Sequence, residues 1–117
     1  MTRLLREIRA LPDQSLVLLG VYFRDADDHF FPARKSAKMI ADASAAPVYG
    51  LLDFYLGYGQ TGGKLISGYH QGQEAAKIAE RILDGENAAN IPVQLQGSNR
   101  NMFDHRVEYR PKSPACR

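Results

Sequence analysis

The sequence predicts an α/β fold, a three-layer α/β/α lobe with helices on both faces of a mainly parallel sheet. The chain has 117 residues, a length typical of one domain. Short unbroken apolar runs alternate along it with amphipathic segments of helical spacing. This alternation is typical of parallel strands joined by helical crossovers. We therefore expect a single α/β lobe over residues 1–117.

The first helix and the first strand are predicted within the first 23 residues. Arg3–Leu11 has apolar residues at helical spacing among charged ones, and Pro12 ends the helix. Leu16–Phe23 is apolar without alternation, which favours a strand buried on both faces of a parallel sheet. The polar stretch Arg24–His29 then forms a loop at the carboxyl end of this strand.

A second helix and a second strand complete a crossover. The helix follows Pro32, and its small residues, Ala37 and Ala41 among them, imply close packing on a sheet. Val48–Leu52 is the next short strand, with Pro47 at its start. Strand, helix and strand in this order form a right-handed parallel crossover. We expect both strands at the centre of the sheet.

The second half of the chain contributes the longest helix and two further strands. The glycine-rich and aromatic segment Asp53–Gly68 precedes a helix over Tyr69–Asp84, which Gly85 ends. Val93–Gln96 is a third strand. Phe103–Tyr109 alternates apolar with polar residues, the pattern of a strand with one buried face. One stripe of the long helix is apolar and contains Ala75, Ile78, Ala79 and Ile82.

Composition excludes several classes of protein. Fifteen basic and 13 acidic residues are interleaved along the chain, so no basic stripe for nucleic acid is visible. One cysteine, Cys116, and three scattered histidines provide no zinc spacing, and we expect no metal site. The longest apolar run is under half of what a bilayer crossing needs. The charged first residues do not resemble a secretory signal peptide.

Sequence motifs do not indicate catalysis. Gly57–Gly62 matches the dinucleotide pattern G-x-G-x-x-G, but no suitably placed strand follows to present a ribose-binding acid. We expect these glycines to form turns and points of close packing. Leu65 stands where a phosphate-binding loop needs Ser or Thr, and no Gly-x-Ser-x-Gly motif occurs. The sequence therefore predicts neither a cofactor nor a catalytic residue.

Aromatic and charged side chains follow both predicted central strands. Ligands of open α/β sheets bind at the carboxyl ends of the strands. An arginine and two carboxylates there would match a zwitterion such as an amino acid, with a tyrosine covering its side chain. The alternatives without ligand binding are that the acidic residues form a solvated loop and that the aromatic rings complete the core. The candidate ligand-binding residues are Tyr22, Arg24, Asp25, Asp53 and Tyr55.

The chain also resembles a known family over about Leu16–Arg110. It is similar to the C-terminal lobe of the type I periplasmic-binding-protein-like fold, in the version related to substrate-binding components of ABC transporters. That version also forms extracytoplasmic sensor regions of bacterial histidine kinases and diguanylate cyclases. The resembling stretches are Pro47–Asp53, Tyr55–Gly59, Gly62–Gly63, Gln71–Gly72, Ala75–Ala76, Arg81–Glu86, Ile91–Val93 and Asn101–Arg106.

The resemblance implies a non-enzymatic lobe that senses a small molecule in signal transduction or transport. Its partner would be the N-terminal lobe of a larger two-lobed protein in the periplasm, and this chain would be a fragment of that protein. Two alternatives remain open. One is a receiver-like phospho-acceptor or small α/β enzyme that uses Asp25 and Asp53, and the other is a dimerisation module. A lobe without its partner would expose apolar surface, so we expect a homodimer.

Overall fold

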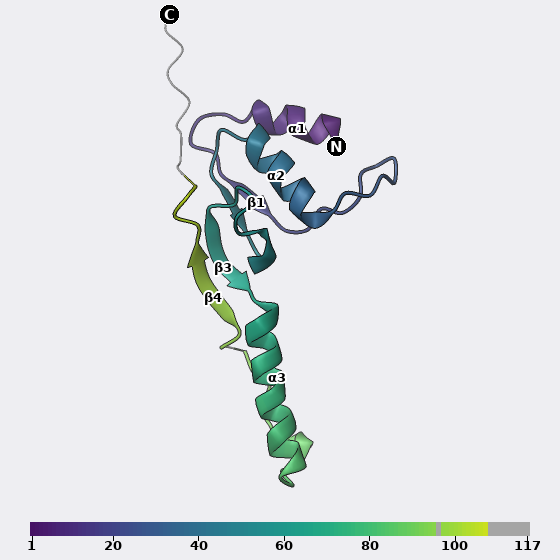
Figure 1. Ribbon diagram of the computed structural model, residues 1–117, viewed down its shortest axis with the longest axis vertical. Helices are drawn as coiled ribbons and strands as arrows, with labels where there is room; N and C mark the ends of the chain where they lie inside the picture. Colours follow the sequence, from purple (N-terminus) through teal and green to yellow (C-terminus); the bar gives the residue numbers. More distant parts are fainter. Residues whose placement is uncertain (96, 108–117) are drawn as a thin grey trace, which may run out of the picture.

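The fold is α/β, with a four-stranded, mainly parallel sheet. A computed structural model of the chain describes residues 1–95 and 97–107 (Figure 1). No helix in the part so described is long and apolar enough to cross a membrane. The helices are α1 (Thr2–Arg9), α2 (Ala33–Ala43) and α3 (Gly68–Leu83), with 3-10 turns η1 (Asp53–Tyr55) and η2 (Ala88–Asn90). The strands are β1 (Val17–Leu19), β2 (Val48–Gly50), β3 (Gly62–Ile66) and β4 (Asn99–Phe103).

The strands lie in the order β1-β2-β3-β4. The first three are parallel, and β4 runs antiparallel to β3. The predicted parallel pairing of the first two strands is therefore confirmed. The prediction that both are central is wrong, because β1 lies at an edge and β3 takes the inner place beside β2.

Helices α1 and α2 cover one face of this sheet (Figure 1). Leu19 of β1 and Val48 of β2 point to that face and pack in one cluster with Ile8 of α1 and Ile40 of α2. Tyr55, from η1, completes the same cluster and is fully buried. This one-sided cluster is the core of the protein, and burial of its apolar side chains is the main favourable term in folding.

The opposite face of the sheet is open to solvent. Leu18 is 62% exposed and Phe103 65%, although both lie on strands. The predicted burial of the first strand on both faces is therefore wrong, since no described helix covers this side. The structure shows the α/β class and the mainly parallel sheet, with a helical layer on one face.

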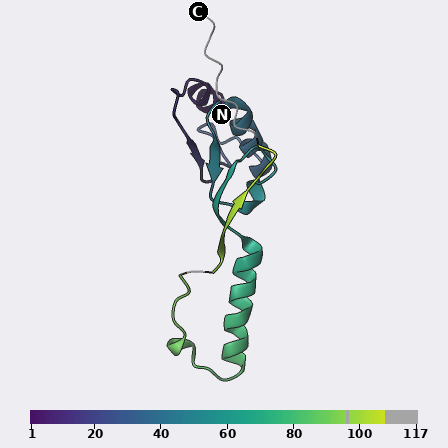
Figure 2. The same ribbon diagram turned by 90° about the vertical axis from the view of Figure 1, so that its left-hand side faces the viewer.

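Helix α3 extends away from the rest of the molecule (Figures 1 and 2). A single residue, Ser67, separates it from β3, and the helix points beyond the end of the sheet. Its predicted bounds are confirmed to within a residue, yet none of its side chains is buried. The molecule is accordingly elongated, at 71 × 33 × 20 Å, with a radius of gyration of 18.9 Å against about 13 Å for a compact domain of this size.

Both strands predicted in the second half of the chain differ from the structure, and a third strand was not predicted. That strand is β3, which lies inside the glycine-rich segment Asp53–Gly68. Residues 93–95 form no strand, and Gln96 lies outside the described residues. The last strand is Asn99–Phe103 rather than Phe103–Tyr109, and residues 104–107 form a turn. Residues 108 and 109 of the predicted strand are outside the described part.

Candidate functional site

The loop between β1 and α2 contains most of the predicted ligand-binding residues. It folds back on itself, because Phe23 and Phe31 are joined by a backbone hydrogen bond of 2.7 Å and Arg24 pairs antiparallel with Phe30. Asp28 closes its tip with a φ of 61°, a backbone region in which aspartate is tolerated better than most residues. The loop thus places Arg24 next to Phe30, six residues further along the chain.

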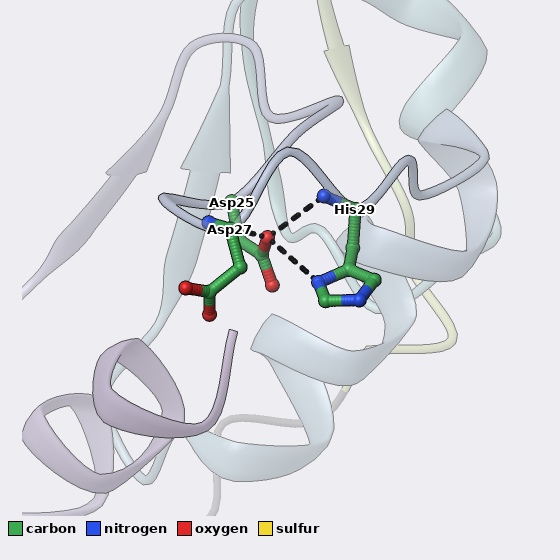
Figure 3. A group of neighbouring side chains, drawn as sticks. All are labelled: Asp25, Asp27 and His29. Carbon is green, nitrogen blue, oxygen red and sulfur yellow. Dashed lines mark hydrogen bonds and ion pairs between the residues drawn. The ribbon is translucent and has the colours of Figure 1, made fainter.

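The carboxylate of Asp25 accepts hydrogen bonds that hold this loop together (Figure 3). Its Oδ1 accepts hydrogen bonds from the backbone N–H groups of Asp27 at 3.1 Å and His29 at 3.0 Å. Its Oδ2 accepts one from the amino group of Met1 at 3.1 Å. Partial burial raises the pKa of this carboxyl, but the His29 N–H, the Met1 amino group and the Asp27 N–H together lower it to about 2. Its oxygens are therefore already engaged by donors within the chain.

Asp25, Asp27 and His29 also bring three metal-binding atom types together. One ligand atom from each lies within 4.8 Å of the others, and His29 Nδ1 is 3.3 Å from Asp25 Oδ1 (Figure 3). Asp27 and His29 are exposed. The hydrogen bonds to Asp25 account for this grouping as a means of ordering the loop, which agrees with the interpretation of the acidic stretch as a solvated loop.

The other predicted site residues lie deeper or apart. Tyr55 is 0% exposed and belongs to the core cluster, so it presents no surface to a ligand in this structure. Burial raises the pKa of its phenol, and the backbone of Tyr22 opposes this without forming a well-aligned hydrogen bond. Asp53 begins η1. Within the described residues, no hydrogen bond or ion pair joins Asp53 to Arg24 or Asp25.

Tyr22 packs the start of this loop against the core and α2. Its ring is partly buried against the core cluster and lies 6.0 Å from the ring of Phe31, centroid to centroid. Its carbonyl accepts a hydrogen bond of 2.9 Å from the hydroxyl of the buried Ser36 in α2. Burial and, to a smaller extent, the Asp25 carboxylate raise the pKa of its phenol. Tyr22 therefore acts mainly in packing the loop on α2.

A hollow opens beyond the carboxyl end of β1, and we call it the strand-end hollow. It has a volume of about 640 Å³ and is lined by Phe23, Arg24, Phe30 and Ala33. Phe23 is 40% exposed and Phe30 62%, so both rings face solvent. Of the residues predicted to bind a ligand, Arg24 alone lines this hollow. Phe23 and Phe30 flank the polar loop in the sequence, but the position of Phe30 opposite Arg24 depends on the loop folding back.

Two sources of positive charge border the strand-end hollow. Arg24 Nη1 donates to the carbonyl of Asp28 at 3.1 Å and to its Oδ1 at 2.9 Å. Both side chains are more than half exposed, and exposed ion pairs of this kind are weak. Ala33 is the first residue of α2, whose N-terminus has no side-chain cap. Free N–H groups at a helix N-terminus favour negative charge.

A second ionic group joins two segments distant in sequence. Asp104 accepts hydrogen bonds from the Gly57 N–H at 3.0 Å, the Arg106 N–H at 3.1 Å, and Arg106 Nε and Nη2 at 2.8 and 2.9 Å. The Arg106 guanidinium, more than any other group, holds the pKa of this carboxyl well below its usual range. Asp104 thereby connects the loop after η1 to the end of β4. Both of its carboxylate oxygens accept hydrogen bonds from described residues of the chain.

No protein family, no curated protein and no solved structure matches this chain.

Proposed function

We propose that this chain is one lobe of a two-lobed protein region that binds a small carboxylate ligand without catalysing a reaction. The supporting observation is the strand-end hollow, which Arg24 lines together with two exposed phenylalanines, Phe23 and Phe30. A guanidinium binds a carboxylate with two parallel hydrogen bonds, and aromatic faces cover an apolar body. Amino acids with an apolar or aromatic side chain combine both features.

The carboxylate would displace Asp28 from Arg24. The free-energy cost of this exchange is small, because the Arg24–Asp28 pair is solvent-exposed and the ligand offers Arg24 a carboxylate in place of the one it loses. The uncapped N-terminus of α2 would add a favourable interaction of about 0.3–1 kcal/mol. Asp25 takes no direct part in this arrangement, since donors of its own loop already surround it.

By the family resemblance, a second lobe would close over the hollow. The hollow is open to solvent on one side, so a ligand held by this chain alone keeps much of its hydration. We therefore expect binding at about millimolar dissociation constants, or roughly −4 kcal/mol. By the family resemblance, the complete protein would act outside the cytoplasm, in sensing or in uptake.

Nuclear magnetic resonance titration of the chain with amino acids and neutral sugars tests this proposal. We expect phenylalanine or leucine to shift the backbone amide signals of Phe23, Arg24, Phe30 and Ala33. Arg24→Ala should abolish these shifts. Arg3→Ala is the matched control, because Arg3 is also exposed and also pairs with a carboxylate four residues away, Glu7.

Two results would contradict the proposal. One is the absence of any shift in the strand-end hollow at amino acid concentrations of about 20 mM, well above a millimolar dissociation constant. The other is sugar binding that Arg24→Ala leaves unchanged, because that would place the recognised groups elsewhere.

A further inference from the structure

We propose that two copies of this chain form a symmetric dimer in which α3 of each copy packs on the uncovered sheet face of the other. The proposal is independent of ligand binding in the strand-end hollow. It rests on two surfaces of the same chain with exposed apolar side chains, one on the sheet and one on α3.

The first surface is the open sheet face. Successive side chains of a strand alternate between faces, and paired residues share a face. Leu18 pairs with Tyr49, Tyr49 with Gly62, and Gly62 with Phe103. Lys64 and Ile66 follow Gly62 at alternate positions of β3, so they belong to this face too. Asn101 pairs with Lys64 and Asn99 with Ile66, so both asparagines share this face. The open sheet face therefore has an apolar part, Leu18, Tyr49, Ile66 and Phe103, beside a polar part, Lys64, Asn99 and Asn101.

Uncovered apolar surface of this kind is unusual for parallel strands. Sheets of parallel strands are almost always covered by helices on both faces. Leu18, Ile66 and Phe103 are nevertheless all exposed here. Neighbouring exposed apolar side chains on one face often mark an interaction surface.

The second surface is the α3 stripe, made of Ala75, Ile78, Ala79 and Ile82. These positions are three and four residues apart and share one side of the helix. None of them is buried, and Ile82 is exposed. Alanines at two of the four positions let a sheet approach the helix backbone closely. An amphipathic helix gains most of its stability by packing such a stripe against another element.

The helix does not cover its own sheet. Ser67 alone separates the end of β3 at Ile66 from the start of α3 at Gly68, and Ser67 is buried. A one-residue link leaves no room for the chain to reverse, and α3 continues beyond the end of the sheet (Figures 1 and 2). The open sheet face and the α3 stripe are therefore separated along the length of one molecule.

A twofold axis brings the two surfaces together. In an isologous dimer each copy gives its α3 stripe and receives the stripe of its partner, so the assembly closes and leaves neither surface exposed. Because α3 and β3 run in similar directions (Figure 1), two antiparallel copies would place each helix along the strands of the other. Helices stacked on a sheet are the usual second layer of α/β folds.

The area fits a weak dimer. Helix α3 is about 10 Å wide and longer than the strands, and the longest strands, β3 and β4, have five residues and are about 17 Å long. The contact footprint is therefore about 170 Å², and counting both surfaces of both symmetric contacts gives about 700 Å². This is below the size of stable specific interfaces, so we expect a dimer that dissociates on dilution.

Sedimentation equilibrium of the complete chain gives the first test. We expect dimers at about 100 μM, and we expect Leu18→Glu and Ile82→Glu each to raise the dissociation constant at least about tenfold, or 1.4 kcal/mol. Val21→Glu is the control for Leu18, because Val21 is 59% exposed and lies beyond the end of β1, outside the open sheet face. Lys77→Glu, opposite the α3 stripe, is the control on the helix.

Disulfide cross-linking gives the second test and identifies the contact. Cys116→Ser is combined with Leu18→Cys in one sample and with Ile82→Cys in another. We expect oxidation of the mixture to link the two different variants. A monomer at 100 μM, or a dimer that both glutamate variants leave intact, would overturn the proposal. So would a disulfide within one monomeric chain that has both cysteines, because α3 would then fold on its own sheet.

Discussion

Two aspartates, Asp25 and Asp104, show how single residues organise the loops of this protein. Each carboxylate accepts hydrogen bonds from backbone N–H groups and from one cationic group. Each therefore has a lowered pKa, about 2 for Asp25. Because these donors occupy their oxygens, the two carboxylates hold loop segments in place, and we assign them a structural role.

Acid should therefore destabilise the protein through these carboxyls. In the unfolded chain an aspartate takes up its proton near pH 3.9, whereas in the fold it stays charged to lower pH. The unfolded state then binds more protons, so stability falls as pH decreases from about 5 to about 2. We expect the melting temperature, followed by circular dichroism, to decrease across this window.

Asp104→Asn separates the contribution of one carboxyl. The variant should have a lower melting temperature than the wild type at pH 7, because the amide loses the charge-assisted bonds to Arg106. Its melting temperature should also depend less on pH between 5 and 2. An equal pH dependence in both proteins would assign the acid sensitivity to other groups.

Of the residues predicted to bind a ligand, Arg24 lines the strand-end hollow and Tyr55 lies in the core, and ligand binding itself stays a prediction. The sequence placed Arg24 beyond a strand end because an apolar run stops abruptly there, and the structure puts Arg24 on the rim of a hollow. It could not predict that η1 turns Tyr55 into the core, since this depends on contacts with α2. Phe30 was missed because its place opposite Arg24 depends on the loop folding back.

At the scale of elements, glycine explains why β3 was not recognised. Gly62 and Gly63 weaken the strand pattern, and such residues indicate a turn when only local propensity is considered. In the structure Gly62 has a φ of 145°, and a Cβ there would lie 2.8 Å from the Cα of Phe103. The need for glycine arises from the close approach of β4, which is 41 residues away in sequence and is invisible to a local pattern.

Matched glycine substitutions test this explanation. Gly62→Ala should destabilise the fold by more than about 1 kcal/mol, because both the backbone conformation and the contact with β4 exclude a side chain. Gly72→Ala should stabilise α3 by about 0.5–1 kcal/mol, since nothing lies within 4 Å of the added atom and alanine favours helix. Urea denaturation measures both changes, and similar values at both positions would contradict the explanation.

At the scale of the whole molecule, stability is concentrated between the sheet and the helices α1 and α2. Leu19 is buried there, whereas Ile82 on α3 is exposed. Sequence periodicity predicted α3 and its apolar stripe, but it could not show that no residue of the stripe is buried by the part of the chain that the structure describes. Which element packs on the apolar face of a helix depends on tertiary structure or on assembly with another chain.

Two truncations of apolar side chains should therefore have very different effects. Leu19→Ala should lower the free energy of unfolding by about 2–5 kcal/mol, the usual cost of a cavity in a core. Ile82→Ala should change it by less than about 0.5 kcal/mol at protein concentrations at which the chain is monomeric. Urea denaturation at about 1 μM measures both, and a large loss at Ile82 would mean that α3 packs within its own chain.

The single-residue link at Ser67 also has a mechanical consequence. Helix α3 is about 24 Å long, and a single residue joins its first turn to β3, whereas its far end is followed by a longer segment that leads to β4. A rotation of about 10° at the link would displace the far end of the helix, near Leu83, by about 4 Å. The helix would then act as a lever, converting a small change of angle in the sheet into a displacement that a bound neighbour could detect.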